Sequence, residues 1–361
     1  MSLENLKQQI ARYAAISGPV GFEEPVLEAA RAELDACCDR VEVDVRGNVY
    51  GYLDGTDPNA PLVMITAHAD EIGFMVTSIL PDGFLRFAKL GGPTDSVLPG
   101  QRVRVLSETG ELEGVIGVKP GHVLRDSTEA RQVPEVSKMY IDVGARTDEE
   151  AAEWGIEPGT PAVFVGEFTE TRNANRCFGK TIDNRMGVVC CLEVARALAD
   201  NKPSANVAIA IVVEEEIGLR GAAVAATHLN PDVVIAIDTV PAGGTPDLNA
   251  DELPWSIGGG PLLKVRETKG LSTHGPLRNL IRDAAEESEI DYQLIVDTAG
   301  MTDATTAQQA GGQVAAAVVG LARRYSHSAV EMFDVSDVAG IIELVTAATR
   351  KISSKEQLLR I

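Results

Sequence analysis

Two kinds of hydrophobic pattern alternate along most of this chain. Unbroken apolar runs at residues 62–66 and 207–213 have the length and composition of strands buried on both faces of a parallel sheet. Between such runs, apolar residues recur at the spacing of amphipathic helices, for example over residues 3–15, 24–35 and 185–199. The alternation predicts an α/β fold with a mostly parallel sheet flanked by helices.

The pattern changes between residues 73 and 165. Short segments of alternating apolar and polar residues, separated by Gly and Pro, are typical of strands with one buried face. One helix is expected there, because Thr147 and Glu150 have the spacing of a capping box. We therefore interpret residues 73–165 as a small β-rich, barrel-like domain inserted into an α/β domain made of residues 1–72 and 166–361.

Length and composition restrict the class of protein. At 361 residues the chain exceeds the size of most single hydrophobic cores, which agrees with two domains. Hydrophobic residues make up 45% and charged residues 24%, as in ordinary soluble globular proteins. The formal net charge of -21 argues against nucleic acid or an anionic membrane as a partner, since both require a basic protein surface. No apolar run reaches transmembrane length, and the amino terminus has helical spacing rather than the pattern of a signal peptide.

The five cysteines favour a reducing compartment. Their number is odd, they include two adjacent pairs, and none has the C-x-x-C spacing of a metal or redox motif. Cys190 and Cys191 fall within a predicted helix, where we expect them to be core residues. We therefore expect a cytoplasmic protein.

Acidic residues and histidines follow the predicted strands. Glu214, Glu215 and Glu216 come directly after the run 207–213. Two like charges about 4 Å apart repel by about 4 kcal/mol at an effective dielectric of ~20, so this triplet needs a cationic partner. Other such residues near strand or helix ends are His68, Asp70, Asp183, Asp238 and His327.

These side chains are expected to converge, because the carboxyl ends of parallel strands open on one edge of a sheet. Two histidines with several carboxylates suit zinc, cobalt or manganese. Taken singly, each has a structural interpretation; Asp183 before a helix, for instance, is also a good N-cap. Their coincidence at successive strand ends favours a metal site. His228 is expected near a helix end, whereas His122 and His274 are equally compatible with a structural role and with an approach to the site.

Five segments together resemble the dinuclear metallo-aminopeptidases that include glutamyl aminopeptidase and the tetrahedral aminopeptidases, peptidase family M42. They are AHADEIGF at 67–74, TIDNR at 181–185, EEIGLRGA at 215–222, ID at 237–238 and RYSHS at 324–328. The resemblance extends from residues 17–23 nearly to the carboxyl end and includes the β-rich insertion. It implies a zinc-peptidase-like fold.

The resemblance also implies two divalent metal ions in each subunit, with zinc or cobalt expected. Asp183 would bridge the two ions. His68 and Asp238 would complete one site, and Glu216 with His327 the other.

The same resemblance assigns two catalytic residues. Glu215 would be the general base that takes a proton from a metal-bridging water and passes it to the leaving amine. Asp70 would hold the His68 ring in its ligating tautomer. Family members commonly have a cis peptide bond after the bridging aspartate, here between Asp183 and Asn184.

The sequence thus predicts a metal-dependent aminopeptidase acting on short peptides and assembling through the inserted domain into a homo-oligomer, from dimer to dodecamer. An N-acyl amino acid deacylase or another amidohydrolase on the same metal core is an alternative, and a non-catalytic scaffold is a further one. Departures from the family pattern, which leave the substrate side chain open, are Glu214 in place of Gln, Met301 in place of Gly, and Ala322 in place of the Pro before Arg323 and Arg324.

Overall fold

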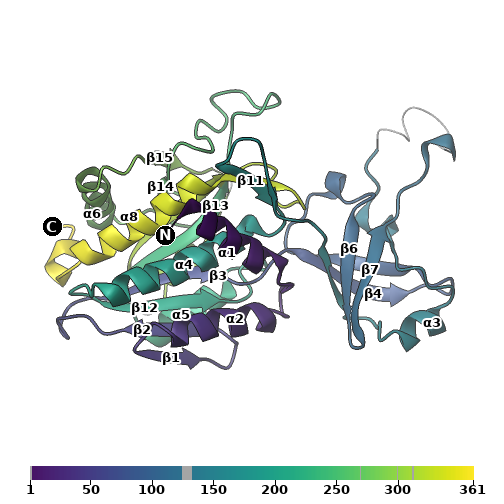
Figure 1. Cartoon of the computed structure of the whole chain (residues 1–361), viewed down its shortest axis with the longest axis horizontal. Coiled ribbons are helices and arrows are strands. Elements are labelled where there is room, and N and C mark those ends of the chain that lie inside the picture. The colour runs from purple at the N-terminus through teal and green to yellow at the C-terminus, as the bar shows by residue number, and fades with distance from the viewer. Residues whose placement is uncertain (1, 124–131, 269, 299, 311–312) are drawn as a thin grey trace.

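The computed structural model describes residues 2–123, 132–268, 270–298, 300–310 and 313–361. A larger part, in which helices surround a sheet, lies beside a smaller barrel, and the two are joined at one end of the sheet (Figure 1). This arrangement confirms the predicted α/β fold with a small barrel-like unit.

The large sheet has eight strands. Its central pairs, β12 with β3, β3 with β13 and β13 with β16, are parallel, while β1, β2 and β14 make antiparallel contacts. In spatial order the strands are β1 (Arg40–Val43), β2 (Val49–Leu53), β12 (Asn206–Val212), β3 (Leu62–His68), β13 (Val233–Pro241), β16 (Ala315–Arg323), β14 (Leu262–Arg266) and β15 (Gln293–Val296).

Helices cover both faces of this sheet, which explains the unbroken apolar runs. Alternate residues of β12 point to opposite faces: Ile209 and Ile211 pack with one helical layer, and Ala210 and Val212 with the other. The first layer contains α1 (Leu3–Ala15), α2 (Glu24–Asp35), α4 (Ile182–Asp200), α6 (Gly275–Glu287) and α8 (Val335–Lys351). The second contains α5 (Arg220–Leu229) and α7 (Asp303–Ala307).

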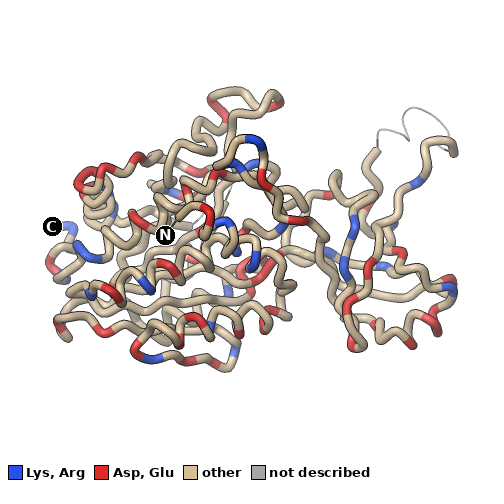
Figure 2. The backbone as a smooth tube through the Cα atoms, in the orientation of Figure 1, with Lys and Arg blue, Asp and Glu red and all other residues tan. Residues whose placement is uncertain are grey.

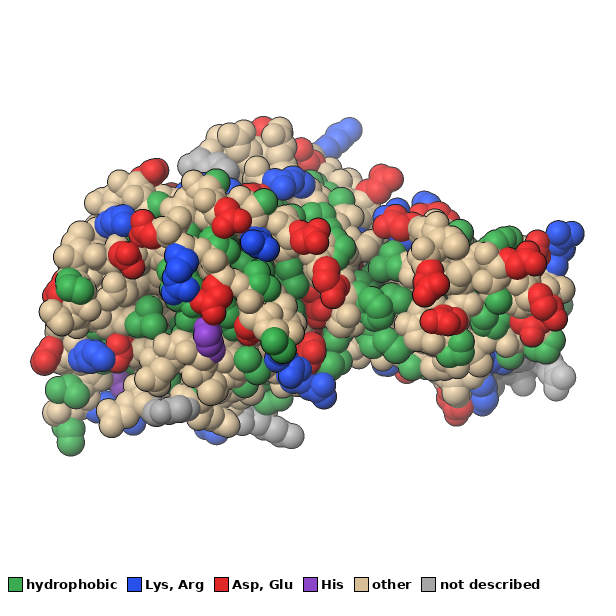
Figure 3. Space-filling view, turned by 90° about the horizontal axis from the view of Figure 1, so that it is seen from below, with side chains coloured by type: hydrophobic (Ala, Val, Ile, Leu, Met, Phe, Trp, Pro, Cys, Tyr) green, Lys and Arg blue, Asp and Glu red, His purple; other side chains and the backbone are tan. Residues whose placement is uncertain are grey.

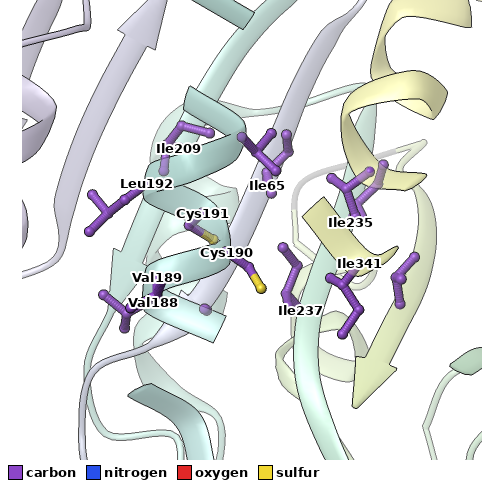
Figure 4. Close-up of a cluster of buried hydrophobic side chains, with 14 of the residues drawn as sticks. Ile65, Val188, Val189, Cys190, Cys191, Leu192, Ile209, Ile235, Ile237 and Ile341 are labelled. Atoms are coloured by element: carbon purple, nitrogen blue, oxygen red, sulfur yellow. The ribbon is translucent and has the colours of Figure 1, made fainter. Parts of the chain in front are cut away.

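The cysteines of α4 lie where the sequence placed them. Cys190 and Cys191 are buried among Ile65, Ile209 and Ile237 between the helix and the sheet (Figure 4). Burial raises the pKa of both thiols, so they are apolar core groups rather than reactive ones.

The barrel is closed and has its own core. Phe74 packs edge-on against Phe87 and Phe164, with ring centroids 5.1 and 5.0 Å apart. The expected capping box forms in part, since the Thr147 side chain accepts a hydrogen bond from the Glu150 backbone at the start of α3 (Asp148–Glu153). Around the barrel the strands are β4 (Gly73–Ile79), β5 (Leu85–Leu90), β8 (Ile141–Asp142), β7 (Gly110–Ile116), β6 (Arg102–Ser107) and β9 (Pro161–Phe164).

The structure also contains a small third sheet. It consists of β10 (Thr169–Glu170), β11 (Arg176–Gly179) and β17 (Glu331–Asp334). The remaining elements are short 3-10 turns: η1 (Asp95–Val97), η2 (Gly121–Val123), η4 (Val136–Lys138) and η5 (Lys355–Leu358).

Acidic residues are not confined to one region of the chain. Acidic residues lie along both the sheet-containing part and the barrel, with basic residues between them (Figure 2). On the face shown in Figure 3, hydrophobic side chains gather where the barrel meets the larger part. Within the described ranges, none of the helices is both long and apolar enough to cross a bilayer.

Candidate metal centre

The register of the parallel strands brings the candidate site residues to one edge of the sheet. His68 at the end of β3 pairs in register with Val212, after which the chain continues into Glu214 to Glu216. Asp238 lies in the neighbouring strand β13, and Asp183 lies at the start of α4. All of these groups except Glu214 line one cavity of about 350 Å³, together with His327.

Two groups of three side chains in this cavity have the geometry of metal ligands. In the first, here called the sheet centre, His68 Nε2 lies 3.4 Å from Asp183 Oδ1 and 3.8 Å from Asp238 Oδ1. In the second, the loop centre, His327 Nε2 lies 3.4 Å from Asp183 Oδ2 and 3.6 Å from Glu216 Oε1. Asp183 belongs to both centres and offers one oxygen to each.

The electrostatics of both centres fit a divalent cation. Burial, followed by the negative charge of Asp183, raises the pKa of Glu216 and of Asp238 to about 7. Asp183 Oδ1 is buried and accepts no hydrogen bond from the described residues. A cation between these oxygens would offset both the repulsion and the lost solvation.

Asp70 connects His68 to the loop that carries the glutamates. Its Oδ1 lies 3.4 Å from His68 Nδ1, and its two carboxylate oxygens accept hydrogen bonds from the backbone amides of Glu215 and Glu216, each at 3.0 Å. Burial opposes ionisation, but the contact with His68 and these amides lower the pKa of Asp70. Asp70 is therefore a fixed anion near Nδ1 of the imidazole ring.

The backbone after β12 leaves strand geometry. Glu214 has a φ of 55° and Gly218 a φ of 125°, so the chain turns and both Glu215 and Glu216 face the cavity. Glu214 points elsewhere and pairs with Arg46 at 2.6 Å.

Glu215 is a member of neither metal group. Its Oε2 lies 4.0 Å from His68 Nε2, and burial raises the pKa of its carboxyl group well above the usual value. A carboxylate so placed is suited to accept a proton within the cavity.

Asp183 and His327 are held by a residue that the sequence pattern did not reveal. Glu331 Oε2 accepts a hydrogen bond from the Asp183 backbone at 3.0 Å, and Oε1 accepts one from the His327 backbone at 2.9 Å. The peptide bond between Asp183 and Asn184 is cis, which confirms the expectation from the resemblance. Glu331 begins a short strand of unremarkable composition, so only its three-dimensional contacts identify it.

Two basic side chains also line the cavity, and both are paired. Arg323 Nη2 lies 2.5 Å from Asp183 Oδ2, and its other terminal nitrogen contacts Glu331. Lys264 Nζ lies 2.9 Å from Glu267 Oε1 and 3.0 Å from Asp297 Oδ2. Arg323 could be found from the sequence, because it lies at the carboxyl end of an apolar run that forms β16. No such signal marks Lys264 within β14.

Four further residues were considered in the sequence, and only one of them lines the cavity. Met301 lies in the cavity wall. His228 lies in the last turn of α5, as expected, and contacts Glu42. His122 lies in η2, His274 is the residue before α6, and neither is among the described residues that line the cavity.

Fold and site together define a metal-dependent hydrolase, with a histidine- and carboxylate-rich site at the edge of an α/β sheet. The family model of the M42 glutamyl aminopeptidases matches residues 47–344, and the chain belongs to this family. It is therefore an aminopeptidase whose activity depends on divalent metal ions.

Named relatives and solved structures agree with this assignment. The chain is 33% identical over 334 residues to glutamyl aminopeptidase of Lactococcus lactis, covering 92% of each chain. It is 36% identical over 310 residues to lysyl aminopeptidase of Pyrococcus furiosus, covering 86% of each. The structure of an aminopeptidase from Desulfurococcus kamchatkensis matches with a TM-score of 0.93 and 35% identity, over 99% of this chain and 98% of that one. These relationships do not favour the deacylase and scaffold alternatives.

Proposed function

We propose that two divalent ions, zinc or cobalt, bind in the sheet centre and the loop centre and that the enzyme removes single residues from the amino termini of short peptides. The observation that carries this proposal is the shared residue Asp183, whose two oxygens lie 3.4 Å from His68 Nε2 and from His327 Nε2. Ions bound there would make a water molecule more acidic and polarise the scissile carbonyl.

Glu215 is the general base in this proposal. It takes a proton from the attacking water and then delivers it to the nitrogen of the departing peptide. In the metal-free protein, burial raises the pKa of this carboxyl group, which favours holding the proton until the leaving nitrogen accepts it. Asp70 acts through His68. Its backbone carbonyl accepts a hydrogen bond from Nδ1 at 3.2 Å, and its carboxylate lies 3.4 Å from the same nitrogen, so Nε2 faces Asp183 and Asp238.

The size and charge of the cavity indicate which amino-terminal side chains of a substrate it can accept. Its volume of about 350 Å³ suits a side chain with the adjoining peptide unit rather than a folded protein. Lys264 and Arg323 are each paired with two carboxylates. Neither of the basic side chains among the described residues of the cavity wall is available to a substrate carboxylate, so we expect no preference for acidic amino-terminal residues.

Assembly and location complete the proposal. One solved relative, the TET1 peptidase of Pyrococcus horikoshii, can assemble into a tetrahedron or a large octahedral shell. Its structure matches with a TM-score of 0.84 and 30% identity, over 96% of this chain and 99% of that one. We propose a homo-oligomer here as well, from dimer to dodecamer, assembled through a domain of residues 73–165 between the two segments 1–72 and 166–361 of the catalytic domain. The free thiols of the cysteines fit the reducing cytoplasm.

A substrate panel tests the activity. Metal-free protein is reloaded with zinc, cobalt or manganese and assayed on dipeptides and aminoacyl amides with Leu, Lys or Glu at the amino end. Each substrate is paired with its N-acetylated form. We expect cleavage of the free amines only, and none without metal. Preferred cleavage of the acetylated forms would instead show a deacylase.

A further inference from the structure

A turn of the barrel reaches the loop centre. Gly91 and Gly92 follow β5 and precede η1, so they belong to the barrel by sequence and topology. Yet their closest neighbours include Glu216 and His327 of the larger part.

One contact of this turn fixes the His327 ring. His327 Nδ1 lies 2.9 Å from the carbonyl oxygen of Gly92. A carbonyl only accepts hydrogen bonds, so the proton of a neutral ring is on Nδ1. The unprotonated nitrogen is then Nε2, the atom that faces Asp183 and Glu216. The Thr94 backbone amide also donates to the His327 carbonyl at 3.5 Å.

The turn approaches so closely that only glycine fits without displacement. A Cβ atom at Gly91 would lie 3.0 Å from Glu216 Oε2 and 2.8 Å from an Ile72 methyl carbon, and the Gly91 φ of 70° is itself unfavourable for other residues. A Cβ atom at Gly92 would lie 3.1 Å from His327 Nδ1. Gly91 therefore packs against Glu216 and Gly92 against His327, two of the three side chains of the loop centre.

We propose that the Gly91-Gly92 turn positions Glu216 and His327, so that the barrel sets the metal affinity of the loop centre. The inference rests on the proposed function, because it takes these two side chains as metal ligands. The sheet centre is held differently: His68 contacts Asp70, and Asp238 lies within strand β13. A substitution in the turn should therefore lower the metal affinity of the loop centre and leave that of the sheet centre unchanged.

Gly92→Ala is the test variant, because Gly92 does not have the positive φ that would add backbone strain. The matched control is Gly121→Ala, at an exposed glycine of η2 where an added Cβ meets no atom of the described residues within 4 Å. Zinc titration of the metal-free, full-length proteins by calorimetry with a competing chelator measures the two affinities separately. We expect one affinity of Gly92→Ala to fall about 10- to 100-fold, the effect typical of a lost supporting contact. The other affinity, and both affinities of the control, should stay within about twofold of wild type.

The outcomes distinguish this inference from the proposed function. If wild type binds fewer than two ions, the proposed function fails. If wild type binds two and Gly92→Ala leaves both affinities unchanged, or weakens both equally, the positioning role is wrong while the proposed function stands.

A second measurement needs no folded variant at position 92. Nitrogen-15 NMR of histidine-labelled, zinc-loaded wild type reports the tautomer of each ring, and His327→Gln identifies the His327 signals by their loss. We expect a protonated, hydrogen-bonded Nδ1 and a metal-shifted Nε2 for His327. Metal binding at Nδ1 would overturn the proposal.

Discussion

The sheet centre and the loop centre share Asp183 but are built on different kinds of structure. The sheet centre takes His68 and Asp238 from β3 and β13, which are neighbouring parallel strands, and only 1% and 8% of these side chains are exposed. The loop centre takes Glu216 and His327 from loops, and 30% of the His327 side chain is exposed. His327 itself has a φ of 57°, a conformation that the surrounding contacts must maintain.

This difference has a physical consequence. Ligands at strand ends are fixed by the same hydrogen-bond ladder that forms the core, so they are in place once the sheet has folded. Ligands on loops depend on separate supports, here Glu331 for the His327 backbone and the Gly91-Gly92 turn for its ring. We therefore expect the loop centre to bind its ion more weakly and to respond to changes far along the chain.

Glu215→Gln should have the largest effect on activity while leaving both centres intact. The amide cannot accept the proton from water, so turnover should fall by about 10² to 10⁴ or more, with metal content unchanged. Turnover of purified, metal-loaded protein and metal analysis of the same sample measure both quantities. Near-normal turnover would end the assignment of Glu215 as the base.

His68→Ala and His327→Ala compare the centres directly. Each should reduce the tightly bound zinc from two ions to one, because a ligand of only one centre is removed. In the wild type, stepwise addition of a chelator should remove the ion of the loop centre first. Full occupancy in either variant, measured by metal analysis after dialysis, would count against that ligand.

Acid should weaken both centres in parallel. In the metal-free protein, burial and then the charge of Asp183 raise the pKa of Glu216, in the loop centre, and of Asp238, in the sheet centre, to about 7. Above that pH the carboxylates are ionised and free to bind; below it each must first release a proton. The pKa of His68 and of His327 is raised as well, so the histidine of each centre must also release a proton, and each affinity should fall about tenfold or more per pH unit below 7. Zinc calorimetry at pH 6 and pH 8, in buffers with different ionisation enthalpies, counts the released protons, and an equal count at both pH values would contradict this.

Glu214→Gln should have the smallest effect. Glu214 pairs with Arg46 at the surface and lines neither centre, so turnover and both zinc affinities should stay within about twofold of wild type. The same assays as for Glu215→Gln apply. A large loss would mean that the third carboxylate acts on the site through its charge.

The sequence predicted the regular part of the fold closely. Helices were expected at residues 3–15 and 24–35, and α1 and α2 have these bounds, since their apolar stripes and end signals agree. The expected helix 185–199 lies within the regular part of α4, and the two residues before it, Asp183 and Asn184, have non-helical backbone angles where the cis peptide bond lies. Local periodicity does not encode such an irregularity.

The candidate site was predictable only in part, and the two centres show why. Pattern alone marked His68, Asp238, His327 and the triplet Glu214 to Glu216, because the carboxyl edge of a parallel sheet is where polar side chains after apolar runs converge. The resemblance to known enzymes was needed to choose Glu216 within the triplet and to assign the residues to two centres. No sequence pattern marks Glu331 or Gly92, because a glutamate at the start of a strand and a glycine in a turn are common in all proteins.

By itself, the sequence determined the α/β architecture, the barrel, and the set of acidic and histidine side chains that gather at one sheet edge. These follow from local hydrophobic periodicity and from the handful of ways in which such elements pack. Tertiary structure alone decided which carboxylate faces the cavity, which pairs with Arg46, and that a turn of the barrel supports His327. Those outcomes depend on contacts between residues far apart in the chain, and no local pattern specifies them.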